Sequence, residues 1–255
     1  MSKKKSKNLG AAQKDTSPFV PQRDKFSHEF KIIQRNDLTE RQKAFLQLAL
    51  DKETKVIFLS GPAGSSKTYL SVLAILEMMQ THHLSDLIYV RAVVESSDHG
   101  MGYLPGDANE KLSPYMAPLL DKLDELLDLP TVKAMQKDNR IIAKPIGFLR
   151  GLNWNARGVI ADEAQNLTIN ELTTLMTRLG QFSKLFICGD LMQSDINGRS
   201  GLPDMIRMFN SEEARAQGIH IFEFTEADIV RSALVRFIVK TIEENKRYNT
   251  PQLKR

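Results

Sequence analysis

The segment GPAGSSKTYL, residues 61–70, has the residue types and the spacing that bind phosphate groups. In the pattern G-x-x-x-x-G-K-[ST], backbone N–H groups of the loop and of the first helical turn point at the phosphates, where the helix dipole also favours negative charge. The lysine reaches the β- and γ-phosphates, and the hydroxyl after it ligates Mg²⁺. We therefore expect a nucleotide to be held by Gly61, Pro62, Ala63, Gly64, Ser65, Ser66, Lys67 and Thr68.

Ser66 departs from this pattern, because the residue before the lysine is normally glycine. Its Cβ and hydroxyl stand where the backbone comes close to phosphate. Serine is small, however, and its hydroxyl can donate a hydrogen bond to a phosphate oxygen. We expect an altered affinity or rate rather than a loss of binding. The alternative is a chance match in a turn, which the strand expected before the loop and the helix expected after it disfavour.

Two acids end a predicted strand in VIADEAQN, residues 159–166. We expect Asp162 to hold the water shell of Mg²⁺ and Glu163 to orient or deprotonate an attacking water. Acids also begin ordinary helices, so the pair alone would leave both interpretations open. Its place downstream of a phosphate loop favours catalysis.

Two glutamines are further candidates for the nucleotide site. Gln193 follows Asp190 in ICGDLMQ, at the end of the next predicted strand. An uncharged amide there can contact the γ-phosphate or the attacking water, and so distinguish a triphosphate from a diphosphate. Gln42, in LTERQKAF upstream of the loop, offers an amide donor and acceptor that match an adenine edge. A glutamine on a helix surface is an equally good interpretation of Gln42.

These residues need a scaffold in which several strands end at one place. Short apolar and β-branched runs predict strands at 55–60, 87–92, 141–146, 158–162, 184–190 and 219–224. Helices are expected at 67–80, 109–129, 168–179 and 226–245. The third of them should begin with a capping box of Thr168 and Glu171 and end at Gly180. Alternating strands and helices predict an α/β fold, with a mainly parallel sheet and helices on both faces.

The chain has a formal net charge of +4, and the excess is concentrated at its start. Residues 1–27 form a basic tail whose first 18 residues carry five lysines and one acid. Few large apolar residues accompany these charges, so we expect the tail to be disordered. It is either a simple solvated tail or a non-specific tether to phosphate backbones. The rest of the chain is nearly neutral, which argues only weakly for nucleic acid.

The only cysteine, Cys188, excludes an intramolecular disulfide and suits a reducing, cytoplasmic compartment. It ends the apolar run KLFIC, which favours a buried structural thiol over a nucleophile. No apolar run approaches the roughly 20 residues that span a bilayer, and no apolar segment follows the basic start as in a secretory signal. We therefore expect no membrane association.

Several segments together resemble the PhoH-like ATPases, relatives of superfamily-one helicases: GPAGSSKTYL, YVRAVVES, MGYLPGDANEKLSPYMAPLLD, FLRG, VIADEAQN and ICGDLMQSD. The resemblance runs from about residue 38 to about residue 240. It implies one RecA-like P-loop NTPase domain, here residues 28–255, that binds and hydrolyses ATP with Mg²⁺ and is linked to RNA or DNA. By position it implies phosphate and Mg²⁺ binding by Lys67 and Thr68, an acid pair of Asp162 and Glu163, and a sensor at Gln193.

The segment 91–122 is specific to that family and is the expected surface for a partner such as single-stranded RNA or DNA. Arg91 leaves a strand tip, where superfamily-one helicases contact the nucleic-acid backbone. Tyr103 and Tyr115 are candidates to stack on bases. For Tyr115 packing is the better interpretation, because it lies four residues before Leu119 on an apolar face.

Two functions fit these patterns. The first is an ATPase that handles RNA or DNA, with helicase-like activity. The second is a nucleotide-driven switch or phosphotransferase that acts on a protein or small molecule, although the sequence shows no arginine-rich lid for it. In superfamily-one helicases an arginine from a second domain closes the ATP site. This chain has no room for a second domain. We therefore expect a homo-oligomer, a ring of six, in which Arg231 enters the neighbouring subunit's site.

Overall fold

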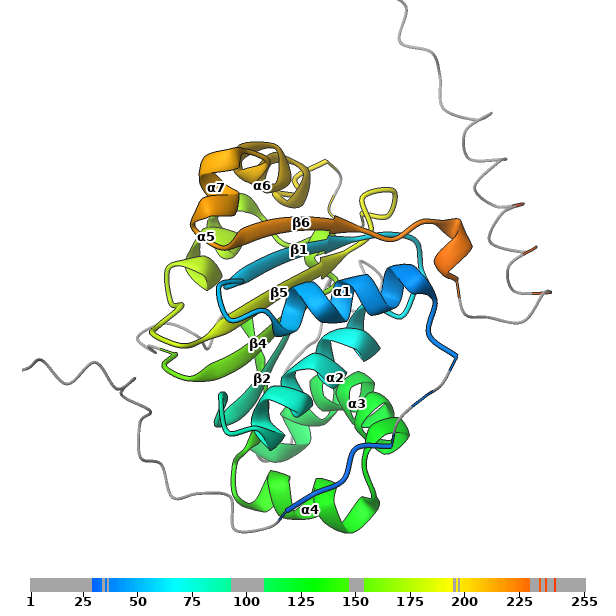
Figure 1. Cartoon of the computed structure of the whole chain (residues 1–255), viewed down its shortest axis with the longest axis vertical. Helices are drawn as coiled ribbons and strands as arrows, with labels where there is room; N and C mark the ends of the chain where they lie inside the picture. The colour runs from blue at the N-terminus through cyan, green and yellow to red at the C-terminus, as the bar shows by residue number, and fades with distance from the viewer. Residues whose placement is uncertain are drawn as a thin grey trace, which may run out of the picture.

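The structure is a computed structural model that describes residues 29–33, 35, 37–92, 108–146, 154–194, 196, 198–229, 234, 237 and 241, with the side chains of 108–115 and 145 left undescribed. At its centre lies a six-stranded sheet in the order β3-β2-β4-β5-β1-β6, in which every pair of neighbours is parallel (Figure 1). All six predicted strands are present: β1 (Val56–Ser60), β2 (Asp86–Arg91), β3 (Ile141–Pro145), β4 (Arg157–Asp162), β5 (Lys184–Gly189) and β6 (Ile219–Glu223).

The strands are nearly continuous apolar runs because both faces of the sheet are covered. In β1, Ile57 and Leu59 point into one hydrophobic cluster, while Val56 and Phe58 point into a second cluster on the opposite face. Strands β1 and β5 are buried along their whole length. The α/β fold predicted from the sequence, a parallel sheet with helices on both faces, is therefore confirmed.

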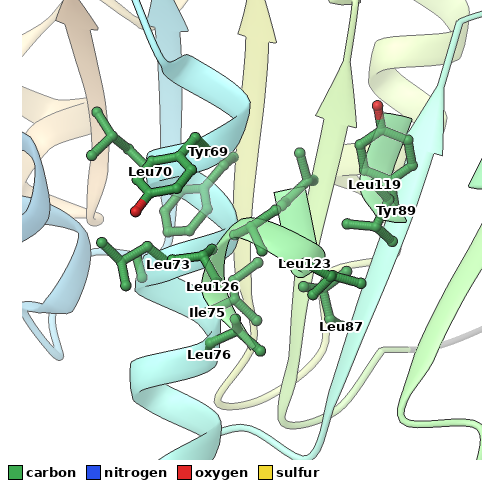
Figure 2. Close-up of a cluster of buried hydrophobic side chains, with 14 of the residues drawn as sticks. Tyr69, Leu70, Leu73, Ile75, Leu76, Leu87, Tyr89, Leu119, Leu123 and Leu126 are labelled. Carbon is green, nitrogen blue, oxygen red and sulfur yellow. The ribbon is translucent and has the colours of Figure 1, made fainter. Parts of the chain in front are cut away.

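One face of the sheet is covered by four helices: α1 (Glu40–Leu50), α2 (Lys67–Gln80), α3 (Ala108–Leu126) and α4 (Leu129–Lys137). Figure 2 shows part of the cluster on this face, to which Leu70 and Leu73 of α2, Leu123 of α3 and Leu87 of β2 all belong. The helix expected at 109–129 is present as α3 but ends at Leu126, and α4 after it was not predicted. Asp128 lies between the two helices, and its carboxylate accepts a hydrogen bond from the backbone N–H of Thr131 at 2.7 Å and so begins α4.

The opposite face carries α5 (Ile169–Met176), α6 (Leu202–Phe209) and α7 (Glu212–Ala216). The predicted capping box of Thr168 and Glu171 is present at the start of α5. The predicted end at Gly180 is wrong, because the helix stops at Met176. The Gly180 N–H instead donates to the carbonyl of Trp154 at 2.7 Å, and a Cβ at Gly180 would lie 2.3 Å from that oxygen. Gly180 thus permits a close approach of two chain segments.

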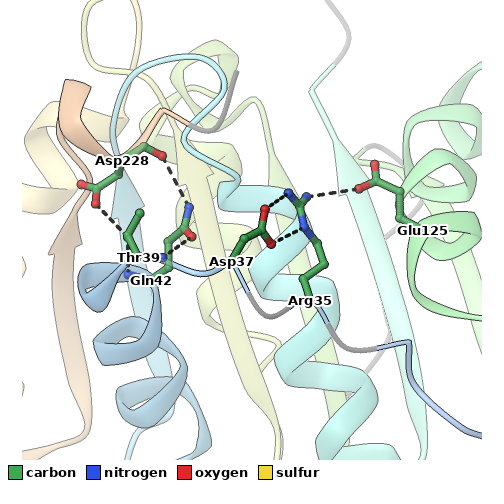
Figure 3. Close-up of polar contacts among 6 residues, drawn as sticks. All are labelled: Arg35, Asp37, Thr39, Gln42, Glu125 and Asp228. Atoms are coloured by element: carbon green, nitrogen blue, oxygen red, sulfur yellow. Dashed lines mark hydrogen bonds and ion pairs between the residues drawn. The ribbon is translucent and has the colours of Figure 1, made fainter. Parts of the chain in front are cut away.

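The helix expected to begin at 226 does not begin there. Residues Glu226–Asp228 form one 3₁₀ turn, and Ile229 after it is extended. The Asp228 carboxylate accepts hydrogen bonds from Thr225 and from the hydroxyl of Thr39, which hold the turn against the start of α1 (Figure 3). Residues 234, 237 and 241 are helical. The rest of that segment and the tail at 1–27 lie outside the described residues.

The parallel register brings the carboxyl ends of the central strands to one edge of the sheet. Ser60 at the end of β1 lies beside Gly189 of β5, and Arg91 of β2 lies beside Asp162 of β4. The helix that follows β1 covers one face of the sheet, whereas the helix that follows β5 covers the other. A crevice opens where connections diverge in this way, and ligands of open parallel sheets bind there.

Among the described residues, no helix is both long enough and apolar enough to cross a bilayer.

The contact between β4 and α2 yields a prediction about stability. A Cβ at Gly158 would lie 2.5, 2.6 and 2.8 Å from three side-chain carbons of Ile75. We expect Gly158→Ala to lower the free energy of unfolding by about 1–3 kcal/mol, measured by urea denaturation. Ile75→Ala removes all three carbons and should cost about 2–5 kcal/mol alone. The double variant should lose less free energy of unfolding than the sum of the two single losses, because the shortened side chain leaves room for the new Cβ. Strictly additive losses would contradict this packing.

Candidate nucleotide site

The loop between β1 and α2 folds around the side chain of Lys67. Its ammonium donates to the carbonyls of Gly61 at 2.7 Å and Pro62 at 2.9 Å, and the Ser65 hydroxyl donates to the same Pro62 carbonyl at 2.8 Å. Burial lowers the pKa of Lys67, while the nearby acids oppose that shift. Gly61 must be glycine, because a Cβ there would lie 2.8 Å from Phe224. The predicted phosphate loop thus has a compact, internally bonded conformation at the amino end of α2.

The backbone of Ser66 is left-handed, with φ 65° and ψ 24°, at the residue that precedes α2. This conformation explains why the pattern asks for glycine, which adopts it without a steric penalty. For a residue with a Cβ the conformation costs about 1–2 kcal/mol. The serine side chain makes no capping hydrogen bond that would offset this cost. Ser66 thus departs from the pattern in two ways, in the approach of its side chain to phosphate and in the strain of its backbone.

Asp162 and Thr68, the two residues predicted to hold a metal, are brought together. One carboxylate oxygen of Asp162 accepts from the Thr68 hydroxyl at 2.9 Å, and the other accepts from the hydroxyl of Tyr89 at 2.5 Å. Burial, reinforced by Asp162, raises the pKa of Tyr89 well above its usual range. Burial also raises the pKa of the Cys188 thiol to about 12. Both groups are therefore protonated at neutral pH, so Tyr89 acts as a donor and Cys188 as a packed thiol.

The donor set fits Mg²⁺ that binds together with a nucleotide. Mg²⁺ is usually held by one or two carboxylates and substrate phosphates rather than by an all-protein cage. Thr68 and Asp162 supply two oxygens of the right kind. Within the described part of the chain, no cluster of three acidic, histidine or cysteine side chains offers an alternative metal site. The buried Oδ2 oxygen of Asp190, beside the same cavity, accepts no hydrogen bond from the described residues and could accept one from a bound ligand.

Glu163 follows Asp162 with a left-handed backbone, φ 54° and ψ 39°. Such a conformation costs of order 1–3 kcal/mol and persists only where the surroundings enforce it, most often at functional sites. The amide nitrogen of Gln165 donates to Glu163 Oε2 at 2.6 Å, and the guanidinium of Arg91 lies 3.8 Å from Oε1. Arg91, predicted to meet nucleic acid, therefore also contacts the predicted base.

The residues after β5 complete the site. The backbone N–H of Asp190 donates to the side-chain oxygen of Gln165 at 3.0 Å, and one Asp190 carboxylate oxygen accepts from the N–H of Met192 at 2.9 Å. Gln193 is exposed and lines the cavity, and its N–H donates to the Asp190 carbonyl at 3.2 Å. Gln165 was not among the predicted site residues, although it lies two residues after Glu163 in the motif.

These groups surround one cavity of about 380 Å³, which lies within the usual size range of small-molecule sites. It is lined by residues of the loop, by Lys67 and Thr68, by both acids and by Gln193. The structure thus brings eight of the predicted site residues to one cavity, whereas Gly61, Pro62 and Ser65 of the loop do not line it. A further part of the wall is formed by residues for which no motif gave a signal: Arg35, Tyr69, Lys122 and Glu125.

Arg35 links this wall to the segment before α1. Its guanidinium donates twice to Asp37, at 2.8 and 2.9 Å, lies 4.0 Å from Glu125 and covers the ring of Tyr69 at 5.5 Å (Figure 3). The hydrogen bonds to Asp37 raise the pKa of Arg35. The cavity wall therefore carries the positive charge of Arg35 close to the negative charge of Glu125.

Gln42 lies apart from this cavity. Its amide oxygen accepts from the N–H of Thr39 at 3.0 Å, and its amide nitrogen donates to the carbonyl of Asp228 at 3.4 Å (Figure 3). The side chain is buried and closes a capping box at the start of α1. Its contact with adenine stays a prediction. Arg231 and Tyr103 lie outside the described residues, as does the side chain of Tyr115, whereas Leu119 is buried in the core as expected.

A solved structure with a weak likeness is that of Pif1 from a Bacteroides species in complex with ADP-AlF4. It is 18% identical, with a TM-score of 0.38, and the match covers 84% of this chain and 47% of that chain. A likeness at this level says nothing about what the present chain binds.

Sequence comparison is more informative. The PhoH-like protein of Mycobacterium tuberculosis is 35% identical over 214 residues, covering 82% of this chain and 59% of that protein. That of Bacillus subtilis is 34% identical, covering 77% and 61%, and Protein PhoH of Escherichia coli is 30% identical, covering 87% and 57%. The chain spans less than two thirds of the length of these relatives. A sequence model of PhoH-like proteins matches residues 35–243, and the chain therefore belongs to the PhoH-like protein family.

Proposed function

We propose that the chain is an ATPase that requires Mg²⁺ and couples hydrolysis to the handling of single-stranded RNA or DNA, with helicase-like activity. The observation that carries this proposal is the convergence of Lys67, Thr68, Asp162 and Glu163 on one cavity at the carboxyl edge of a parallel sheet. A phosphate loop, a metal-holding pair and a half-exposed carboxylate are the parts that nucleotide hydrolysis needs.

In this proposal the triphosphate lies against the loop at the amino end of α2. Backbone N–H groups and the Lys67 ammonium bind the phosphate oxygens, which requires Lys67 to exchange its contacts with the Gly61 and Pro62 carbonyls for phosphate. Thr68 and Asp162 would hold Mg²⁺, which neutralises charge on the phosphates. Tyr89 keeps the Asp162 carboxylate in place through its short hydrogen bond.

Glu163 is the proposed general base. Its carboxylate is 41% exposed and lines the cavity, so a water beside it can reach the terminal phosphate. Gln193, on the loop after β5, would contact the γ-phosphate or that water and so respond to the state of the nucleotide. A general base of this kind contributes about 10² to 10⁴ in rate.

The nucleic-acid partner is supported by Arg91 at the end of β2, by the basic tail and by the family's implied link to RNA or DNA. Arg91 is 32% exposed and lies against Glu163, so a phosphate backbone at Arg91 would be next to the catalytic carboxylate.

The second candidate function is a nucleotide-driven switch or phosphotransferase. For either function we propose a cytoplasmic location in a bacterial or phage-infected cell, and the single cysteine suits such a reducing compartment.

Our proposal for the assembly is a closed ring of six copies, in which Arg231 of one subunit reaches the γ-phosphate in the next. The described residues form one sheet, and an arginine finger is worth roughly 10³ to 10⁵ in rate. The alternative for Arg231 is an exposed helix arginine or one paired with Asp228.

Substitutions in the site test hydrolysis directly. Lys67→Ala should abolish ATP turnover, because the loop loses its cation. Glu163→Gln should still bind ATP but turn it over about 10²-fold more slowly or worse, because the amide cannot accept a proton. Phosphate release and nucleotide binding are the measurements, with the exposed pair Lys52→Ala and Glu212→Gln as controls. Wild-type turnover in Glu163→Gln would assign the base to another residue.

The partner is tested by adding nucleic acid to the same assay. Single-stranded RNA or DNA should raise the ATPase rate of the wild-type protein, and the increase should weaken as salt rises. An ATPase that ignores both nucleic acids would favour the switch or phosphotransferase.

The strained loop residue gives a separate prediction. Ser66→Gly should raise the free energy of unfolding by about 1 kcal/mol, because glycine adopts the left-handed backbone freely, and should change turnover less than about tenfold. Asn139→Gly is a matched control with φ 52° outside the site, and should gain stability without any change in turnover. A rise in ATPase by orders of magnitude in Ser66→Gly would instead mean that the serine keeps the enzyme slow.

The ring is tested by complementation. Arg231→Ala and Lys67→Ala should each be inactive alone, whereas a mixture should recover some activity, because a few interfaces pair an intact loop with an intact arginine. Sedimentation with ATP measures the assembly in parallel. A protein that is monomeric at micromolar concentration and yet hydrolyses ATP rapidly would rule the ring out.

A further inference from the structure

Gln165 is the best-connected side chain beside the predicted base. It is only 4% exposed and lies in the 3₁₀ turn Ala164–Asn166 directly after Glu163. Its amide nitrogen donates to Glu163 Oε2 at 2.6 Å, and its amide oxygen accepts from the backbone N–H of Asp190 at 3.0 Å. One buried side chain therefore joins the end of β4 to the end of β5.

The two partners determine which way the amide points. The Asp190 N–H can only donate, so it requires the oxygen of Gln165, and the nitrogen is then left to face the Glu163 carboxylate, which can only accept when ionised. A glutamate of equal length would offer an acceptor to both sides, and a methionine would offer a strong hydrogen bond to neither. The position therefore needs a side chain that donates at one atom and accepts at the other.

Packing leaves this side chain little freedom to move. A Cβ at Gly189 would lie 3.1 Å from both the backbone nitrogen and the amide oxygen of Gln165, closer than such contacts normally are. The hydroxyl of Ser194 also donates to the Gln165 carbonyl at 3.3 Å. Gln165 is thus fixed against the same loop that carries Gln193.

Arg91 contacts the other oxygen of Glu163, but more weakly. Its guanidinium lies 3.8 Å from Oε1, and the two side chains are 32% and 41% exposed. Half-exposed ion pairs at such distances contribute little, whereas a short hydrogen bond to a charged acceptor is among the stronger ones. The orientation of the Glu163 carboxylate therefore depends mainly on Gln165.

We propose that Gln165 is a positioning residue for hydrolysis: it holds the Glu163 carboxylate toward the cavity and ties its position to the loop of Asp190 and Gln193. This inference rests on the proposed function, in which Glu163 is the base. A shift of that loop would then be transmitted through one side chain to the carboxylate.

Two substitutions separate the two hydrogen bonds of Gln165. Gln165→Glu keeps an acceptor for the Asp190 N–H but turns the bond to Glu163 into a repulsion. Gln165→Met keeps the length and removes both bonds. Both should lower kcat about 10- to 100-fold with little change in KM for ATP, because part of the 10² to 10⁴ contribution of a general base is lost.

The controls separate positioning from stability. Gln47→Met, an exposed glutamine of α1, should leave kcat, KM and melting temperature unchanged. If Gln165→Glu does not fold, the ratio of kcat to KM effects in Gln165→Met still decides the question. Wild-type kcat in a folded Gln165→Met, or a kcat loss matched by a rise in KM, would overturn the inference and leave the ATPase standing. A wild-type protein that does not hydrolyse ATP would overturn both.

Discussion

The parallel register of the central strands is the constraint on which the rest of this protein depends. Ser60, Arg91, Asp162 and Gly189 end neighbouring strands within one residue of each other in register, because β1, β5, β4 and β2 all run in one direction. A slip of one residue in β4 would turn Asp162 from the cavity to the other face of the sheet and exchange the side chains that pack in the two hydrophobic clusters. The two hydrophobic clusters that fix this register therefore also fix the chemistry at its edge.

Two residues at this edge have left-handed backbone conformations, which are unfavourable for residues other than glycine. Ser66 directly precedes α2 and Glu163 follows β4, both in the left-handed region. Each is attached to an element that is buried almost throughout, α2 in one case and β4 in the other. Strain of order 1–3 kcal/mol at each position is small against the burial of those elements, so the core can hold both residues in place.

The two acidic side chains beside the cavity, Asp162 and Glu163, differ in exposure, and neutral donors contact each of them at hydrogen-bond distance. Asp162 is 8% exposed and is satisfied by two hydroxyls, of Thr68 and Tyr89, rather than by a cation. Glu163 is more exposed and is oriented by an amide and, at greater distance, by Arg91. A buried acid held by neutral donors and a neighbouring open one suit different tasks, the first to bind a metal and the second to meet water.

The sequence by itself determined what depends on local patterns. Apolar runs predicted all six strands, the box of Thr168 and Glu171 predicted the start of α5, and the loop motif singled out Lys67 and Thr68, which line the cavity. Asp128 was a local signal too, and it was overlooked. Other features were decided only by tertiary structure: the bridge from Gln165 to Asp190, the contact of Arg91 with Glu163 and the role of Gly180 in a close chain approach. These residues meet partners from other strands and segments, and no spacing along the chain encodes such distances before the sheet has formed its register.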